Sequence, residues 1–173
     1  RNEAKRIRAD PKLRDRILKS RFVLTEKEHE TGEATTAKAR LVIVGCSDPD
    51  IGTISVSSPT ISKDALPIVL QILASQKWKL HIGDIKGAFM KSRSLKRENG
   101  PIYASLPSIW PVDGVDQDVL IELKIAWYGL IDGPSEFYTT YFEFVRGLGC
   151  VRSKLDPCVF YYRNSEGKLS GVI

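Results

Sequence analysis

The chemistry that this sequence could support centres on one carboxylate, that of Asp84, in the stretch from Trp78 to Met90. Leu80 and Ile82 alternate with polar neighbours before the acid, a pattern that predicts a short strand ending at Asp84. A glycine three residues later allows a sharp turn, and Phe89 follows the acid by five residues. A carboxylate at a strand end can ligate a divalent cation, but it can equally make a turn or cap a helix. This stretch alone leaves both interpretations open.

Apolar periodicity predicts the elements that would position this acid. Apolar residues at helical spacing predict a helix over 62–76, which leads into the strand before Asp84. A second amphipathic helix is predicted over 135–148 and ends at a glycine. The expected strand segments are 22–24, 41–44, 78–84, 101–107, 119–124, 159–162 and 169–173. The first two should form an antiparallel hairpin turning near Gly32, and the last two a hairpin turning over 164–167.

Composition sets the outer limits. The 173 residues, 42% of them hydrophobic, can bury one sizeable core, so one domain or slightly more is expected. No apolar run approaches the roughly 18 residues of a membrane span, and no signal peptide follows the basic start. We therefore expect a soluble intracellular protein without a membrane partner, in a cytoplasmic particle or the nucleus. Three cysteines without Cys-x-x-Cys spacing and two distant histidines argue against a zinc site or a disulfide framework.

Positive charge is concentrated at the N-terminus. Residues 1–21 hold nine basic and three acidic side chains, a balance of +6, whereas the rest of the chain has a balance of −1. Such an arm often binds phosphate backbones through counterion release. The candidate nucleic-acid contacts are Arg6, Arg8, Arg14, Arg16 and Lys19. The alternative is a solvated helix with one apolar stripe, since Ile7, Leu13 and Leu18 are loosely spaced among the charges.

Four segments, in order along the chain, resemble the reverse transcriptases of Ty1/copia-type retrotransposons. Asp84 to Phe89 reads Asp-Ile-Lys-Gly-Ala-Phe and resembles the first catalytic motif, Asp-Val-Lys-x-Ala-Phe. Lys38 to Val42 reads Lys-Ala-Arg-Leu-Val, as in the fingers subdomain. Tyr128-Gly129-Leu130 resembles the second template and nucleotide motif, and 151–160 resembles a Ser-x-x-Asp-Pro segment. Their shared order from about residue 21 to 173 is more specific than any one of them.

This resemblance implies template-directed DNA synthesis on an RNA/DNA template-primer with deoxynucleotide triphosphates. It implies two Mg²⁺ ions, or Mn²⁺, about 3.5–4 Å apart, with Asp84 as the catalytic metal ligand and the Ile85 carbonyl beside it. The nucleotide-binding residues that it implies are Lys38, Arg40, Phe89, Tyr128 and Gly129. Phe89 would be the steric gate against ribonucleotides, and Gly129 would let the backbone approach the base pair closely. The alternative interpretation of Phe89 is a core aromatic under the turn. The alternative interpretation of Lys38 and Arg40 is an ordinary exposed pair on a strand.

One segment departs from the family pattern. Residues 131–135 read Ile-Asp-Gly-Pro-Ser where Lys-Gln-Ala-Pro-Arg is usual, so two positive charges are lost and Asp132 adds a negative one. Each lost charge-assisted phosphate contact is worth about 1.5–3 kcal/mol. If these side chains face the nucleotide, substrate affinity falls by one to a few orders of magnitude, as in a divergent or decaying copy.

The expected fold class is α+β: polymerase fingers and palm, helices packed on an antiparallel sheet, incomplete at the C-terminus. We expect a basic arm over 1–20, fingers over about 21–76 and palm over about 77–173. The sequence has no Asp-Asp pair, which the resemblance implies in a hairpin turn just after a strand like 169–173. The expectation is therefore a fragment that does not polymerise alone, its partners including the remaining polyprotein segments. A noncatalytic nucleic-acid-binding remnant is the alternative.

Overall fold

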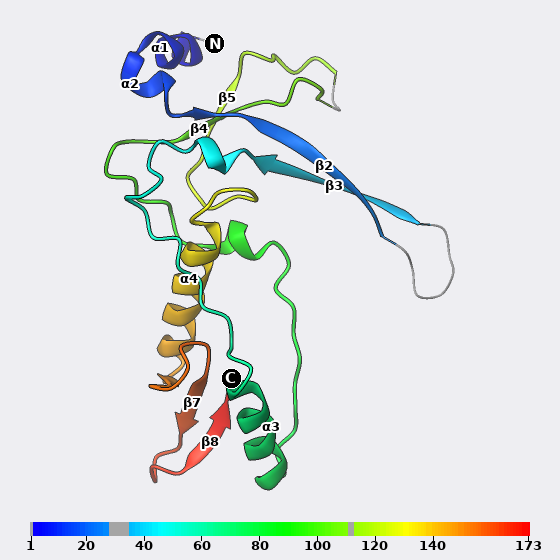
Figure 1. The fold of residues 1–173 in the computed structure, drawn as a ribbon, viewed down its shortest axis with the longest axis vertical. Coiled ribbons are helices and arrows are strands. Elements are labelled where there is room, and N and C mark those ends of the chain that lie inside the picture. Colours follow the sequence, from blue (N-terminus) through cyan, green and yellow to red (C-terminus); the bar gives the residue numbers. More distant parts are fainter. Residues whose placement is uncertain (1, 28–34, 111–112) are drawn as a thin grey trace.

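In the described part of the chain, helices and two three-stranded sheets build an elongated body, from which a two-stranded sheet projects as a ribbon (Figure 1). The computed structural model describes residues 2–27, 35–110 and 113–173. The helices are α1 (Asn2–Ala9), α2 (Pro11–Arg14), α3 (Ala65–Ser75) and α4 (Gly133–Gly147), with 3-10 turns η1 (Gly45–Ser47) and η2 (Ala88–Lys91). The strands are β1 (Ile17–Leu18), β2 (Ser20–Lys27), β3 (Thr36–Ile43), β4 (Tyr103–Ser105), β5 (Leu120–Glu122), β6 (Val151–Arg152), β7 (Phe160–Arg163) and β8 (Leu169–Val172). Within those ranges no helix is long and apolar enough to cross a membrane.

The strands form three separate sheets among the described residues, with orders β1-β4-β5, β2-β3 and β6-β7-β8. Each neighbouring pair is antiparallel except β1–β4, which is parallel. The mixed helix and strand composition is confirmed, and so are both predicted hairpins, β2–β3 and β7–β8. The predicted turn near Gly32 lies outside the described residues, whereas Gly167, with φ of 76°, makes the turn of the second hairpin.

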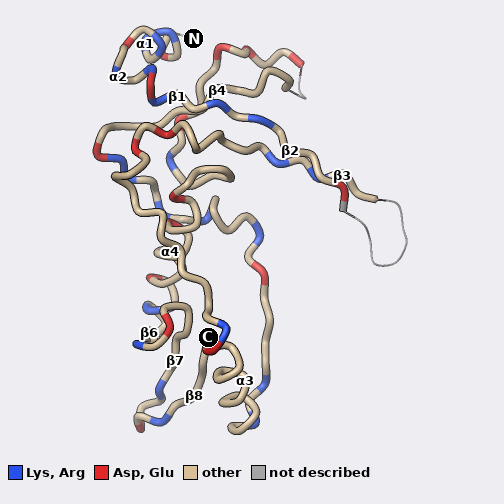
Figure 2. The backbone as a smooth tube through the Cα atoms, in the orientation of Figure 1, with Lys and Arg blue, Asp and Glu red and all other residues tan. Residues whose placement is uncertain are grey.

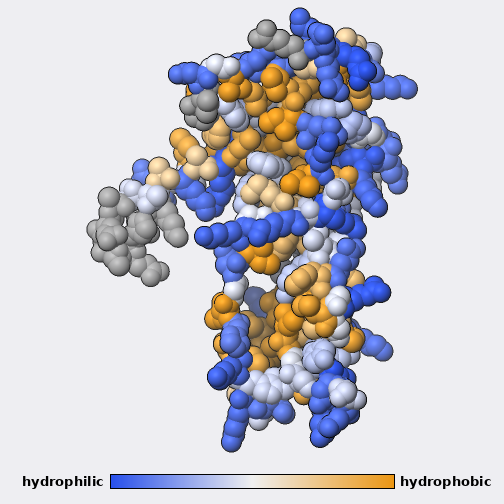
Figure 3. All heavy atoms as spheres, turned by 180° about the vertical axis from the view of Figure 1, so that it is seen from behind, coloured by the Kyte–Doolittle hydropathy of each residue, from blue (hydrophilic) through white to orange (hydrophobic). Residues whose placement is uncertain are grey.

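Both long helices lie where the apolar spacing predicted them. α3 begins just after Ser62, whose hydroxyl accepts a hydrogen bond from the Ala65 N–H at 3.1 Å. α4 has a proline in its first turn, where the missing N–H costs little. Between α3 and the β7–β8 hairpin lies an apolar groove of about 260 Å³, visible as a hollow in the lower half of the molecule (Figure 3). Its helical wall is formed by Ala65, Ile68, Val69 and Ile72.

Buried apolar residues gather in two clusters, one at each end of the body. The upper cluster joins β1, β3, β4 and the chain before α4 through Leu18, Ile43, Ile102, Ala104, Leu123 and Leu130. The lower cluster packs α4 on β7 through Val145, Cys150 and Phe160. A row of ring contacts connects η2 to this lower cluster, formed by the pairs Phe89–Phe137, Phe137–Tyr141 and Tyr141–Phe160. The first helical turns of α4 therefore link the two halves of the molecule.

The predicted strand before Asp84 is wrong. Residues 78–85 carry no strand assignment, and Leu80 and Ile82 are 58% and 91% exposed. A strand is defined by hydrogen bonds to a neighbour, and residues 79–85 make no backbone hydrogen bond to any described residue. The alternating pattern is therefore real in the sequence but has no partner strand in the described part of the chain.

A buried ion cluster centred on Arg97 ties four distant segments together. Arg97 Nη2 lies 3.1 Å from Asp48 Oδ2 and 2.9 Å from Asp132 Oδ2, and its Nη1 lies 3.8 Å from Asp50 Oδ2. Arg16 completes the cluster with two hydrogen bonds to Asp50, of 3.0 and 2.8 Å. These side chains are at most 6% exposed. The cluster therefore holds three carboxylates and two guanidinium groups away from water.

Two pKa values respond to this cluster in opposite directions. The hydrogen bonds from Arg16 lower the pKa of Asp50 from 3.8 to about 2, so this carboxylate stays charged. Burial raises the pKa of Asp132, and the neighbouring Arg97 opposes that rise. Since Arg16 is 5% exposed and held by Asp50, the expectation that it contacts nucleic acid is wrong. Its charge is used inside the protein.

Gly129 fixes the root of the β2–β3 ribbon, which is its end at the Ser20–Ile43 pair, against the chain that precedes α4. Its φ is +92°, and a Cβ at this position would overlap the carbonyl oxygen of Ile43. The backbones are joined beside it, because the Ile43 N–H donates to the Tyr128 carbonyl at 2.7 Å. The indole N–H of Trp127 donates to the Leu41 carbonyl at 2.8 Å. Only a residue without a side chain permits this close approach.

Replacing Arg97 with methionine should lower the free energy of unfolding by about 3–5 kcal/mol, because three buried carboxylates would lose a shared cation. Arg93→Met is the matched control. Arg93 is 44% exposed and pairs with Glu136 at the surface, so its loss should cost no more than about 1 kcal/mol. Urea unfolding of the two variants measures the difference. Equal costs would contradict a structural role for the cluster.

Gly129→Ala should destabilise the protein more than Gly52→Ala. Both glycines have positive φ, +92° and +95°, so alanine meets a similar backbone penalty of about 1–3 kcal/mol at each. A Cβ at Gly52 meets nothing within 4 Å, whereas at Gly129 it must push β3 away. Thermal unfolding compares the two variants, and hydrogen exchange at Ile43 reports on the ribbon root. Unchanged protection of the Ile43 N–H from hydrogen exchange in the Gly129→Ala variant would show that the contact between Gly129 and β3 does not hold the ribbon.

Candidate functional site

The candidate catalytic acid, Asp84, lies exposed in the extended stretch before η2. Gly87 has a φ of 63°, so the predicted sharp turn after the acid is confirmed. Ile85, the predicted neighbouring ligand through its carbonyl, is also exposed. Among the described residues, no group of three or more His, Cys, Asp or Glu side chains is placed to hold a metal ion. A cation at Asp84 would therefore need oxygen ligands from outside this set, such as nucleotide phosphates.

The structure brings the acid motif and the glycine motif together through two aromatic rings. The ring centroids of Phe89 and Tyr128 lie 5.6 Å apart in an edge-to-face arrangement. Phe89 also contacts Phe137 of α4, with centroids 6.5 Å apart. Phe89 is half-buried. These contacts account for an aromatic residue at this position, and they join the segment after Asp84 to the segment that contains Gly129.

The two predicted phosphate contacts of the fingers lie on the projecting ribbon. Lys38 and Arg40 occupy alternate positions of β3 and so share one face of it. Lys38 is exposed and Arg40 half-buried, and neither forms an ion pair with any residue of the described ranges. Within the described residues, both charges on that face are therefore unpaired.

The N-terminal residues form a folded segment. Ile7 and Leu18 are buried, at 4% and 1% exposed, but they lie on α1 and β1, so the alternative of one helix with an apolar stripe is wrong. Arg6 and Arg14 lie on the surface, 3.9 Å from Glu3 and 3.7 Å from Asp15. The remaining candidates are Arg8, which donates to the Asp118 carbonyl at 3.5 Å, and the exposed Lys19. Acidic neighbours thus offset part of the positive charge counted in the sequence.

Asp132 lies away from the surface where a nucleotide could meet its charge, contrary to the expectation from the sequence. It immediately precedes α4, is 4% exposed and is paired with Arg97. The same inward placement applies to Ser135, which is 7% exposed. The predicted repulsion of substrate by Asp132 therefore loses its structural basis.

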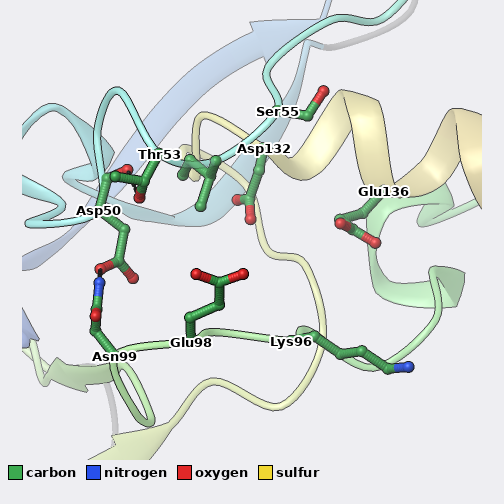
Figure 4. A pocket seen from close by; sticks show the side chains of 9 residues that line it. Asp50, Thr53, Ser55, Lys96, Glu98, Asn99, Asp132 and Glu136 are labelled. Atoms are coloured by element: carbon green, nitrogen blue, oxygen red, sulfur yellow. Dashed lines mark hydrogen bonds between the residues drawn. The ribbon is translucent and has the colours of Figure 1, made fainter.

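A polar cavity of about 180 Å³ adjoins the ion cluster (Figure 4). The carboxylates of Asp132 and Glu98 point toward each other across it, Glu136 lies to one side, and Lys96 extends away (Figure 4). No sequence pattern indicated this cavity or the role of Arg97, because 91–100 reads as a polar loop. Three polar residues of that loop have hydrogen-bond partners 43 to 49 residues away along the chain: Arg93 with Glu136, Arg97 with Asp48, and Asn99 with Asp50.

Comparison with known proteins places the chain in a family. Residues 2–172 match the family described as reverse transcriptase (RNA-dependent DNA polymerase). The chain is 28% identical over 152 residues to the retrovirus-related Pol polyprotein from transposon TNT 1-94 of Nicotiana tabacum, which covers 87% of this chain and 11% of that protein. It is 29% identical over 145 residues to the Pol polyprotein from transposon RE2 of Arabidopsis thaliana, covering 83% of this chain and 10% of the relative.

The Pol polyprotein from transposon RE1 of Arabidopsis thaliana is 26% identical over 151 residues, covering 87% of this chain and 10% of the relative. The chain thus spans about a tenth of the length of these curated relatives. No solved structure matches it significantly. The match over nearly all its residues confirms the resemblance carried by the four segments, and the chain belongs to the reverse transcriptase family, with the copia-type retrotransposon enzymes.

Proposed function

We propose that this chain is the part of an RNA-directed DNA polymerase that holds the incoming deoxynucleotide against the template-primer. The observation that carries the proposal is the contact of Phe89 with Tyr128, which joins the acid motif to the glycine motif within a matched reverse transcriptase domain. In the reaction, a primer 3′-hydroxyl attacks the α-phosphorus of the nucleotide and pyrophosphate leaves. Two divalent cations of the Mg²⁺ type supply charge stabilisation at the attacking and leaving oxygens.

The residues near Asp84 fit a hard cation. Asp84 is an exposed carboxylate, and Mg²⁺ is commonly bound by one or two carboxylates together with substrate phosphates. In this proposal Asp84 and the Ile85 carbonyl supply the protein oxygens, while Lys38 and Arg40 contact phosphate oxygens. Tyr128 and Gly129 border the nucleotide, and the ring of Phe89 excludes a 2′-hydroxyl. The partners are then template-primer, deoxynucleotides and the rest of the polyprotein.

Asp84→Asn should weaken binding of a deoxynucleotide in the presence of Mn²⁺ by about tenfold or more, since one charged ligand contact is worth about 1.5–3 kcal/mol. Asp64→Asn is the matched control, because Asp64 is also exposed and its side chain makes no capping hydrogen bond to α3. Fluorescence titration with a labelled deoxynucleotide, repeated with EDTA, measures the effect. Equal affinities of the two variants would remove Asp84 from the site.

We expect the 173-residue chain alone not to extend a primer. A two-metal site needs several acids converging from different elements, and Asp84 is the one acid here in a family catalytic position. The sequence has no Asp-Asp pair to supply the others. The assay is primer extension on an RNA template with Mg²⁺ or Mn²⁺, comparing the chain with its Asp84→Asn variant. Extension that disappears in the variant would show that the expectation is wrong.

A further inference from the structure

The polar cavity beside the ion cluster contains a buried oxygen atom that lacks a hydrogen-bond donor. Asp132 Oδ2 lies 2.9 Å from Arg97 Nη2, but Asp132 Oδ1 accepts no hydrogen bond from any residue that the structure describes. The Asp132 side chain is 5% exposed, and its carboxylate points into the cavity (Figure 4). Burial raises the pKa of this carboxyl, which reflects the cost of keeping a charge there. A donor or a cation inside the cavity would lower that cost.

The charges around this cavity do not balance. Figure 2 shows acidic and basic positions close together in the loops above α4, and the ion cluster there combines three carboxylates with two guanidinium groups, a net charge of −1. Glu98 adds a second negative charge, because its carboxylate faces Asp132 across the cavity and forms no ion pair with a described residue. Glu136 is paired with Arg93 at 2.7 Å, and Lys96 extends away (Figure 4). The excess is therefore two negative charges.

The size and the oxygen atoms of the cavity indicate which cation it fits. Its volume of about 180 Å³ has room for six or more water molecules, at about 30 Å³ each in the liquid. Among the described residues, no three acidic, histidine or cysteine side chains are placed to hold a metal ion directly, so a cation here must keep its water shell. Mg²⁺ gives up water reluctantly, whereas Ca²⁺ takes six to eight oxygen ligands and Zn²⁺ takes direct nitrogen, sulfur or oxygen ligands. Hydrated Mg²⁺ is therefore the best match in both size and charge.

We propose that this cavity binds a hydrated Mg²⁺ ion, whose water molecules donate hydrogen bonds to Asp132 Oδ1 and to the carboxylates of Glu98 and Glu136. The ion offsets the two excess negative charges and supplies the donor that Asp132 Oδ1 lacks. It joins the 91–100 loop to the start of α4 and so stabilises the folded chain. Asp84 does not line this cavity, so the site is separate from the proposed catalytic one and does not depend on the proposed function.

The site depends on a residue at which this chain departs from the copia-type pattern. Asp132 stands where that pattern has glutamine, a neutral side chain. With glutamine in place of Asp132, the ion cluster would have two carboxylates and two guanidinium groups and would be neutral without a further cation. The need for a bound cation therefore arises from the substitution at this position.

Thermal unfolding of the chain in increasing concentrations of MgCl₂, at constant ionic strength and without nucleotide, tests the proposal. An ion that binds only the folded state raises the unfolding midpoint as its concentration increases. We expect this rise with Mg²⁺ and a smaller rise with Ca²⁺, which favours direct oxygen ligands. Hexaamminecobalt(III), whose six ammonia ligands donate hydrogen bonds and do not exchange, should replace Mg²⁺. No rise with Mg²⁺, or a larger one with Ca²⁺, would overturn the proposal.

Two variants with the same change of charge locate the ion. Glu98→Gln removes one of the two excess charges at an exposed position, so the fold should tolerate it. It should lower the apparent affinity for Mg²⁺ by about fivefold or more, the effect of one unit charge about 4 Å away even with aqueous screening. Glu26→Gln removes the same charge from β2, outside the cavity, and should leave the affinity unchanged. Equal affinities of the two variants would overturn the proposal.

Two further variants separate this site from the proposed catalytic one. Asp132→Asn keeps the shape of the side chain and should remove most of the dependence on Mg²⁺; if this variant does not fold, Glu98→Gln decides. Asp84→Asn should keep the dependence on Mg²⁺. Its loss in Asp84→Asn together with its retention in Glu98→Gln would place the ion at Asp84 and overturn this proposal alone. An Asp84→Asn variant with unchanged nucleotide affinity and intact stabilisation by Mg²⁺ would remove only the proposed function.

Discussion

The buried charges around Arg97 impose the constraint on which the rest of this structure depends. Removing two guanidinium groups and three carboxylates from water is costly unless each finds a partner in good geometry. That requirement fixes Arg16 before β1, the acids Asp48 and Asp50 after η1, and Asp132 before α4. Hydrophobic contact is non-directional and would tolerate small shifts of these segments, but hydrogen-bonded ion pairs would not. The cluster therefore fixes the segment that follows the glycine motif against Arg97 and against the loop after η1.

The ribbon inherits its position from this arrangement. Two strands alone are marginally stable in water, so β2–β3 needs a fixed root. Arg16 precedes β1, and the hydrogen bonds from Ile43 and Trp127 join β3 to the segment that runs into Asp132. Both ends of the root are thus anchored on residues of the same cluster or next to it.

Local pattern was enough to predict both hairpins, α3, α4 and the turn at Gly87, because periodicity and turn chemistry act within a few residues. The strand before Asp84 was mistaken because a strand depends on a neighbour that local pattern cannot supply. Arg16 was assigned to the surface because charged side chains are seldom buried, and its partner Asp50 is 34 residues away. The contact of Phe89 with Tyr128 could be predicted from the sequence only through the family resemblance, which paired their motifs.

The departure at residues 131–135 has a different meaning once the packing is known. In isolation, an acid and two lost cations beside a nucleotide indicate a weakened or decaying enzyme. Asp132 instead points inward and completes the coordination of Arg97 by carboxylates, and Ser135 is buried one turn of α4 away. A longer cationic side chain at Ser135 would have to displace packed neighbours before it could reach a phosphate. The burial of Asp132 and Ser135 therefore removes the argument for loss of function that their residue types suggested.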